Sequence, residues 1–187
     1  MFFGTFNPIH IGHMIIGNFM ATNTDLQQVW FIVSPHNPLK DKKTLAPDRI
    51  RLQMVRLAIE DNPHLRASDI EFNLPQPSYT IDTLIYLKEK YPQHELTLIM
   101  GSDNLISLEK WKNYQQILSN YTIYVYRRPG HDVNPYADNK NLKMLDVPQI
   151  MLSASQIRIY IEEGKSIRYM VHESVYEFLD GNKLYKK

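Results

Sequence analysis

The chain has no cysteine in its 187 residues, and this absence excludes several kinds of chemistry. Disulfide bonds, cysteine-ligated zinc, iron–sulfur clusters and thiol catalysis all need the missing side chain. The sequence also lacks an apolar run near the ~18 residues of a membrane span, and no basic segment followed by an apolar one opens the chain. We therefore expect a protein of the reducing cytoplasm, without a membrane anchor or an export signal.

A strong excess of charge of either sign is missing as well. Lys and Arg number 21 against 20 Asp and Glu, which gives a formal net charge of +1. Proteins that bind nucleic acids or membrane surfaces through a global basic field carry more positive charge, so we expect neither partner. Hydrophobic residues make up 43% of the chain and charged residues 22%, which is typical of a globular protein. Any anionic ligand must be held by a local site.

Short apolar runs alternate with segments of helical periodicity along the chain. This pattern predicts an α/β protein with a doubly wound, Rossmann-like parallel sheet. The expected strands cover residues 2–3, 29–33, 67–72, 95–100 and 121–126, with one or two more in 142–152, and the expected helices cover 11–20, a segment from 47–48 onward, 80–91, 108–118, 155–163 and 172–179. No long linker or repeat divides the sequence. We expect a single domain over residues 1–187, with a small helical portion from about residue 153.

The most informative motif follows the first expected strand. Residues 4–13 read GTFNPIHIGH, which places His10 and His13 on one face at the start of a helix. A glycine lets a ligand approach the backbone, a helix N-terminus offers unpaired N–H groups, and imidazoles can donate to phosphate oxygens. We interpret the segment as a polyphosphate cradle, although it fits neither the P-loop nor GxGxxG. Incidental histidines, or a metal pair without an obvious third ligand, are the alternatives.

A second candidate anion site lies late in the chain. Residues 153–158 read SASQIR, at the expected junction of a strand and a helix. Ser155 is a natural helix N-cap, which is a purely structural explanation for it. Hydroxyls at a helix N-terminus, with Arg158 three residues further on, would equally bind an anion from the side opposite the first motif.

These segments resemble those of the HxGH nucleotidyltransferase superfamily, and most closely the bacterial nicotinate mononucleotide adenylyltransferases. GTFNPIHIGH and SASQIR resemble the superfamily's two signatures. Elements similar to the nicotinate branch are SPHNPLK at 34–40, PSYTIDTL at 77–84, GSD at 101–103, Trp111 and RRPG at 127–130. The resemblance implies a nucleotidyltransferase domain and an ATP-binding transferase of NAD biosynthesis. Such an enzyme moves AMP from ATP to nicotinate mononucleotide, with Mg²⁺ accompanying ATP, and releases nicotinate adenine dinucleotide and pyrophosphate.

The resemblance also implies roles for individual residues. It implies ATP contacts from Gly4, Thr5, Phe6, His10, Gly12, His13, Gly101, Asp103, Ser155 and Arg158, and nicotinate mononucleotide contacts from Asn7, His36, Thr80, Trp111, Lys112 and Arg128. The expected catalytic residues are His10, His13, Lys40 and Arg158, which would offset the repulsion between two polyanions. A phosphomonoester is largely dianionic at pH 7, so its attack needs no general base. Helix capping or core packing is the simpler alternative for several of these residues.

The sequence departs from the family pattern at three positions. Phe3 stands at the first of two usual glycines, Asn37 at a usually basic position, and Lys112 where relatives often have Tyr. Lys40, or one of the two lysines just after it, could supply the charge missing at Asn37. Lys112 beside a pyridine carboxylate would suit an acid substrate.

Several functions stay open on the sequence alone. Within the superfamily, nicotinamide mononucleotide or phosphopantetheine could be the phosphate acceptor instead. A non-catalytic nucleotide-binding module is the alternative from another class, and nucleic-acid binding ranks behind both because the basic residues are dispersed. Relatives include dimers and larger assemblies, so the resemblance is compatible with a homo-oligomer.

Overall fold

A computed structural model of the chain describes residues 1–35, 45–131 and 133–186. Its strands are β1 (Phe2–Gly4), β2 (Val29–Val33), β3 (Leu65–Ser68), β4 (Thr97–Gly101), β5 (Thr122–Tyr126) and β6 (Leu142–Leu145). They form one sheet in the order β3-β2-β1-β4-β5-β6, and every neighbouring pair is parallel. This order confirms the predicted Rossmann-like sheet, whose topological switch point lies between β1 and β4.

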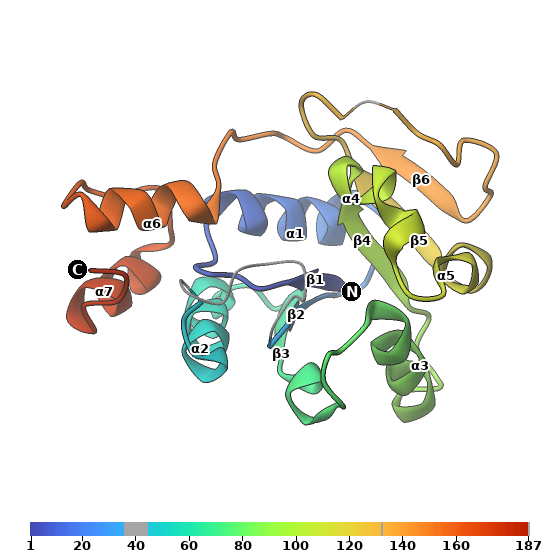
Figure 1. Cartoon of the computed structure of the whole chain (residues 1–187), viewed down its shortest axis with the longest axis horizontal. Coiled ribbons are helices and arrows are strands. Elements are labelled where there is room, and N and C mark those ends of the chain that lie inside the picture. Colours follow the sequence, from blue (N-terminus) through green and yellow to red (C-terminus); the bar gives the residue numbers. More distant parts are fainter. Residues whose placement is uncertain (36–44, 132, 187) are drawn as a thin grey trace.

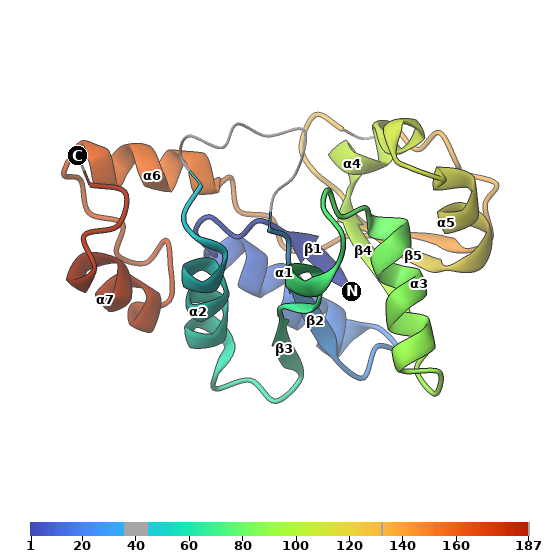
Figure 2. The same cartoon turned by 60° about the horizontal axis from the view of Figure 1, so that its bottom comes forward.

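Helices cover both faces of the sheet (Figures 1 and 2). They are α1 (Ile11–Asn23), α2 (Asp48–Ile59), α3 (Thr80–Lys90), α4 (Ser102–Ile106), α5 (Tyr114–Asn120), α6 (Ala154–Glu162) and α7 (Glu173–Gly181), with short 3₁₀ helices η1 (Ile70–Asn73) and η2 (Leu108–Lys110). Successive strand residues alternate between the two faces. In β2, Phe31 belongs to the core cluster under α1, α2, α6 and α7, whereas Trp30 and Ile32 pack with α3 on the other face. All five residues of β2 are buried, as expected for a parallel strand covered on both sides.

Two of the sequence-based element assignments are wrong. The expected strand over 67–72 ends at Ser68, and the chain turns into η1, where the Phe72 N–H donates to the Asp69 carbonyl at 2.9 Å. The expected helix over 108–118 is two pieces, η2 and α5. Asn113 separates them with a φ of 51°, in the left-handed region that interrupts an α-helix. Hydrophobic spacing alone does not report such a break.

Two further differences concern short elements. α4 was not expected, because its five residues start directly at the end of β4 and are too few to show helical periodicity. Of the strands expected within 142–152, the structure has only β6, which ends at Leu145. No helix in the described ranges combines the length and the apolar character needed to cross a membrane.

Candidate functional site

A cleft of about 560 Å³ opens at the carboxyl ends of the central strands, where the switch point of the sheet predicts a ligand site. Many of the expected site residues line it: Gly4, Thr5, Phe6, Asn7, His10, His13, Asp103, Trp111, Arg128, Ser155 and Arg158. A neighbouring cavity of about 390 Å³ shares four of them, namely His10, His13, Asp103 and Arg128, and is lined in addition by apolar residues of the segment after β6. The structure thus brings segments from both halves of the chain around one site.

The two histidines of the first motif stack against each other at the start of α1. Their ring centroids lie 3.7 Å apart with an interplanar angle of 29°. His13 Nδ1 accepts a hydrogen bond from the His10 backbone N–H at 3.3 Å, so the proton of a neutral His13 ring is on Nε2. The His10 Nδ1 is buried and has no hydrogen-bond partner among the described residues. A Cβ at Gly12 would lie 3.1 Å from the His10 ring, so a glycine leaves the room that this ring needs.

Burial sets the charge of His10. The residue is only 7% exposed, and burial, assisted by the charge of Arg128, lowers its pKa to about 4. A neutral imidazole is therefore the dominant form near pH 7. A neutral His10 ring can stack on the His13 ring without charge repulsion and can still donate a hydrogen bond to an anion.

The loop after β1 is shaped by Gly4 and held from the C-terminal part of the chain. A Cβ at Gly4 would come within 2.8 Å of the buried Phe6 ring, so only glycine allows this close packing. Arg158 Nη1 donates to the Asn7 carbonyl at 2.7 Å, and its Nη2 donates to Ser155 Oγ at 3.2 Å. The interpretation of Ser155 as the N-cap of this helix is wrong. Ser153 is the cap and accepts from the Gln156 N–H at 3.1 Å, because α6 begins at Ala154.

The end of β4 brings together an acidic and a basic side chain. Arg128 Nε lies 3.5 Å from Asp103 Oδ1, an oxygen that is buried and accepts no hydrogen bond within the described part of the chain. A Cβ on Gly101 would stand 2.3 Å from that oxygen and 3.0 Å from Arg128 Nε. Gly101 does not line the cavities itself, but its missing side chain makes this arrangement possible.

The expected acceptor residues are less tightly gathered. Trp111 lines the cleft, whereas Thr80 and Lys112 are absent from its described lining. Lys112 Nζ forms an ion pair with Asp82 at 2.8 Å and lies 4.9 Å from the centroid of the Tyr79 ring. The expected contacts His36 and Lys40, together with Asn37, fall outside the described residues.

Sequence reasoning missed Arg51, the most deeply buried charge near the site. It is fully buried and donates five hydrogen bonds, to the carbonyls of Thr5, Ser34, Pro35 and Ala46 and to Asp48 Oδ1, at 2.6 to 2.9 Å. The guanidinium therefore ties the loop after β1 to the loop after β2 and to the start of α2. A signal was present in the sequence, because Arg51 shares the buried face of α2 with Val55 and Ala58.

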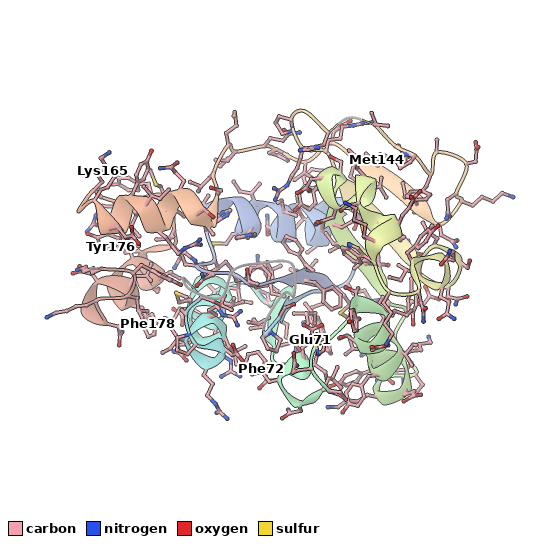
Figure 3. All side chains as sticks on the ribbon, viewed as in Figure 1. Glu71, Phe72, Met144, Lys165, Tyr176 and Phe178 are labelled. Carbon is pink, nitrogen blue, oxygen red and sulfur yellow. The ribbon has the colours of Figure 1, made fainter. Side chains whose placement is uncertain are left out.

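Glu71 was also missed. This residue of η1, labelled in Figure 3, is 3% exposed. Thr83 Oγ1 donates to its carboxylate at 2.7 Å. Burial raises the pKa of Glu71, and hydrogen bonds from the Thr83, Ser34 and Ser78 hydroxyls partly offset that rise. Two of these three hydroxyls, those of Ser78 and Thr83, belong to the PSYTIDTL segment, and Glu71 is their partner inside the protein.

The described residues contain no group of three or more His, Asp or Glu side chains arranged to hold a metal ion. Asp103 is the single carboxylate among the described residues that line the two cavities. Mg²⁺ commonly binds through one or two carboxylates, water and substrate phosphates. The site therefore fits a Mg²⁺ ion that arrives with a nucleotide better than a metal held by the protein alone.

Comparison with known proteins agrees with this geometry. A family model described as cytidylyltransferase-like matches residues 1–160. The chain is 52% identical to a probable nicotinate-nucleotide adenylyltransferase of Flavobacterium johnsoniae, over 100% of this chain and 98% of that protein. It is 50% identical to a protein of the same name from Cytophaga hutchinsonii, over 99% and 96%. A solved structure of Plasmodium falciparum nicotinic acid mononucleotide adenylyltransferase complexed with NaAD superposes with a TM-score of 0.83 at 16% identity, over 98% of this chain and 95% of that chain, which shows a shared fold.

Proposed function

This chain belongs to the cytidylyltransferase-like family, and we propose that it acts as a nicotinate-nucleotide adenylyltransferase in NAD biosynthesis. The reaction transfers AMP from ATP to nicotinate mononucleotide and yields nicotinate adenine dinucleotide and pyrophosphate. The observation that carries the proposal is the stacked pair of imidazoles, His10 and His13, at a helix start that faces the switch-point cleft. We place this activity in the cytoplasm as part of the proposal.

At the phosphate end of the cleft, which we define as His10, His13 and Arg158, the side chains would stabilise negative charge. The two imidazole rings would donate N–H groups to the triphosphate without adding a permanent charge to the site. Arg158 uses one N–H on Asn7 and one on Ser155, and a guanidinium has five. Its remaining N–H groups would approach the phosphates from the side opposite the histidines.

No proton has to leave the attacking group. The 5′-phosphate of the acceptor has its second pKa near ~6 and is largely dianionic at pH 7. Its oxygen would attack the α-phosphorus in line, and pyrophosphate would leave. Catalysis then consists of holding two polyanions in this geometry and of stabilising the charge that develops on the leaving group. A Mg²⁺ ion that arrives with ATP would supply part of that stabilisation, and Asp103, the one carboxylate in the described lining, would be available to hold it.

The remaining roles follow the family resemblance. We assign the adenosine of ATP to Gly101 and Asp103, with Gly4, Thr5, Phe6, Gly12 and Ser155 around the phosphates. We assign the acceptor to Asn7, Trp111 and Arg128, which line the cleft, and to Thr80, whose backbone would hold the pyridine carboxylate. Lys112, His36 and the catalytic Lys40 complete the proposed set.

The first test is pyrophosphate release from Mg·ATP with nicotinate mononucleotide, nicotinamide mononucleotide and phosphopantetheine in parallel. We expect a strong preference for the nicotinate substrate. In the same assay, His13→Ala should lower kcat about 10²- to 10³-fold, as does the loss of one donor to a developing charge, with a smaller change in KM for nicotinate mononucleotide.

The other outcomes separate the alternatives. Turnover with another acceptor would retain the adenylyl-transfer chemistry and overturn the assignment of the acceptor. Binding of ATP without turnover of any acceptor would indicate a non-catalytic nucleotide-binding module. An unchanged kcat in His13→Ala would remove His13 from the mechanism.

A further inference from the structure

The C-terminal segment of the chain reaches back into the loop after β1. Tyr185 Oη donates a hydrogen bond to Asn7 Oδ1 at 2.5 Å, between residues 178 positions apart in the sequence. The ring of Tyr185 packs against the core cluster that contains Phe6. Burial raises the pKa of the Tyr185 hydroxyl, so this group keeps its proton at neutral pH and can act as a donor.

Backbone conformation and a local ion pair direct the segment to this position. Lys183 and Tyr185 have φ values of 51° and 62°, in the left-handed region that costs energy for residues other than glycine. The Leu184 N–H donates to the Leu179 carbonyl at 3.2 Å, and Lys186 pairs with Asp180 at 2.7 Å. These contacts on both sides of Tyr185 hold the segment against α7, beside which Figure 1 shows the C-terminus.

Two donors fix the orientation of the Asn7 amide. Besides Tyr185, the Ala46 backbone N–H donates to Asn7 Oδ1 at 3.1 Å. A backbone N–H can only donate, so the Asn7 atom that faces it must be the amide oxygen. The amide NH₂ is thereby directed to the other side of the group. Asn7 itself is 5% exposed and lines the cleft.

We propose that Tyr185 is a positioning residue of the reaction, whose hydroxyl holds the Asn7 side chain in the orientation in which it meets the acceptor nucleotide. The inference rests on the proposed function, since Asn7 is assigned there to the acceptor. The Asn7 carbonyl is bound by Arg158 at the same time. Asn7 is therefore held at its backbone by the phosphate end of the cleft and at its side chain by the C-terminal segment.

The test is the substitution Tyr185→Phe, which removes the hydroxyl and keeps the ring. Loss of one buried hydrogen bond should raise KM for nicotinate mononucleotide about three- to tenfold, while KM for ATP should stay within about twofold. Tyr160→Phe is the matched control, because Tyr160 is another half-buried tyrosine that packs against the same cluster. We expect both constants of this variant to equal those of the wild type.

A double-mutant cycle with Asn7→Ala separates positioning from general stabilisation. If Tyr185 acts through Asn7, adding Tyr185→Phe to Asn7→Ala should change KM for the acceptor no further. An undiminished second effect, or a wild-type KM in Tyr185→Phe alone, would overturn the inference and leave the proposed function standing. Wild-type protein that does not turn over nicotinate mononucleotide would overturn the proposed function, and this inference with it.

Discussion

One buried titratable side chain lies at the phosphate end of the cleft and another lies outside its described lining, and the two respond to pH in opposite ways. At the phosphate end, burial lowers the pKa of His10 to about 4. At the acceptor end, which we define as Glu71, the start of α3 and Lys112, burial raises the pKa of Glu71. Burial favours the neutral form of an acid and of a base alike. A polyanion therefore meets the neutral ring of His10 together with the guanidinium of Arg158 at one end, while the other end has a carboxylate that accepts hydrogen bonds from hydroxyls.

Arg51 ties the loop after β1 to the loop after β2 and to the start of α2, and its loss should have the largest effect. Arg51→Met would leave four backbone carbonyls without their donor. Removing one partner from a buried charged network costs about 3–5 kcal/mol, and we expect the free energy of unfolding to fall by that amount. Urea denaturation measures it. Arg56→Met, at an exposed position of the same helix, is the control. A loss below about 1 kcal/mol would mean that the loops hold each other without Arg51.

His10 should make stability depend on pH in the acidic range. The unfolded chain protonates it near pH 6.5 and the folded chain near pH 4. Between these values the unfolded state binds more protons, so folding stability falls as the pH drops. The loss amounts to about 3 kcal/mol over the whole window. Urea titrations at about pH 7, 5.5 and 4.5 measure how the free energy of unfolding depends on pH across this window. His10→Asn should lose the part of this dependence that comes from His10. The control His94→Asn, at an exposed position, should retain it. An identical slope in both variants would contradict a buried neutral His10.

Glu71 should show the opposite sign and a smaller effect. The folded state holds its proton above the ordinary value of 4.5, so folding stability falls as the pH rises through the folded pKa. Glu71→Gln cannot ionise and should lose this component. The exposed Glu89→Gln should not. The effect is smaller than at His10 because hydroxyl hydrogen bonds offset part of the cost of burial. A wild-type slope in Glu71→Gln would mean that these hydroxyls compensate for burial completely.

Features that are built from one continuous segment could be predicted from the sequence. The phosphate end is built largely by one continuous segment, residues 4–13. Its strand end, glycines and two histidines predict the loop and the helix start from the local sequence alone. The alternation of strands and helices follows equally from local hydrophobic patterns, and the parallel sheet was predicted correctly from it. Local information is sufficient where neighbours in the sequence are also neighbours in space.

Contacts between distant residues were not predictable in this way. Arg51 ties the loops after β1 and β2 to the start of α2 through backbone carbonyls, and the side-chain pattern that marks Arg51 as buried does not indicate these partners. The hydrogen bond from Tyr185 to Asn7 depends on left-handed residues near the C-terminus that no motif announces. Asn113 breaks an expected helix for the same kind of reason. Each case depends on tertiary geometry that overrides or escapes local preference.

Lys112 should have the smallest effect, and it tests how exposed the acceptor end is. Its side chain is 44% exposed and is paired with Asp82, which is 46% exposed. Such pairs contribute about 0.2–1 kcal/mol. A contact between this exposed cation and a substrate carboxylate should be worth as little as such a pair. We therefore expect Lys112→Ala to raise KM for nicotinate mononucleotide less than about fivefold. If Lys112 also meets the pyridine carboxylate, Asp82→Ala should lower that KM by freeing the cation, and KM for the amide substrate should change in neither variant. A rise above about tenfold in Lys112→Ala would exceed the contribution of an exposed ion pair. It would mean that Lys112 leaves Asp82 and makes a direct contact with the acceptor that is shielded from solvent.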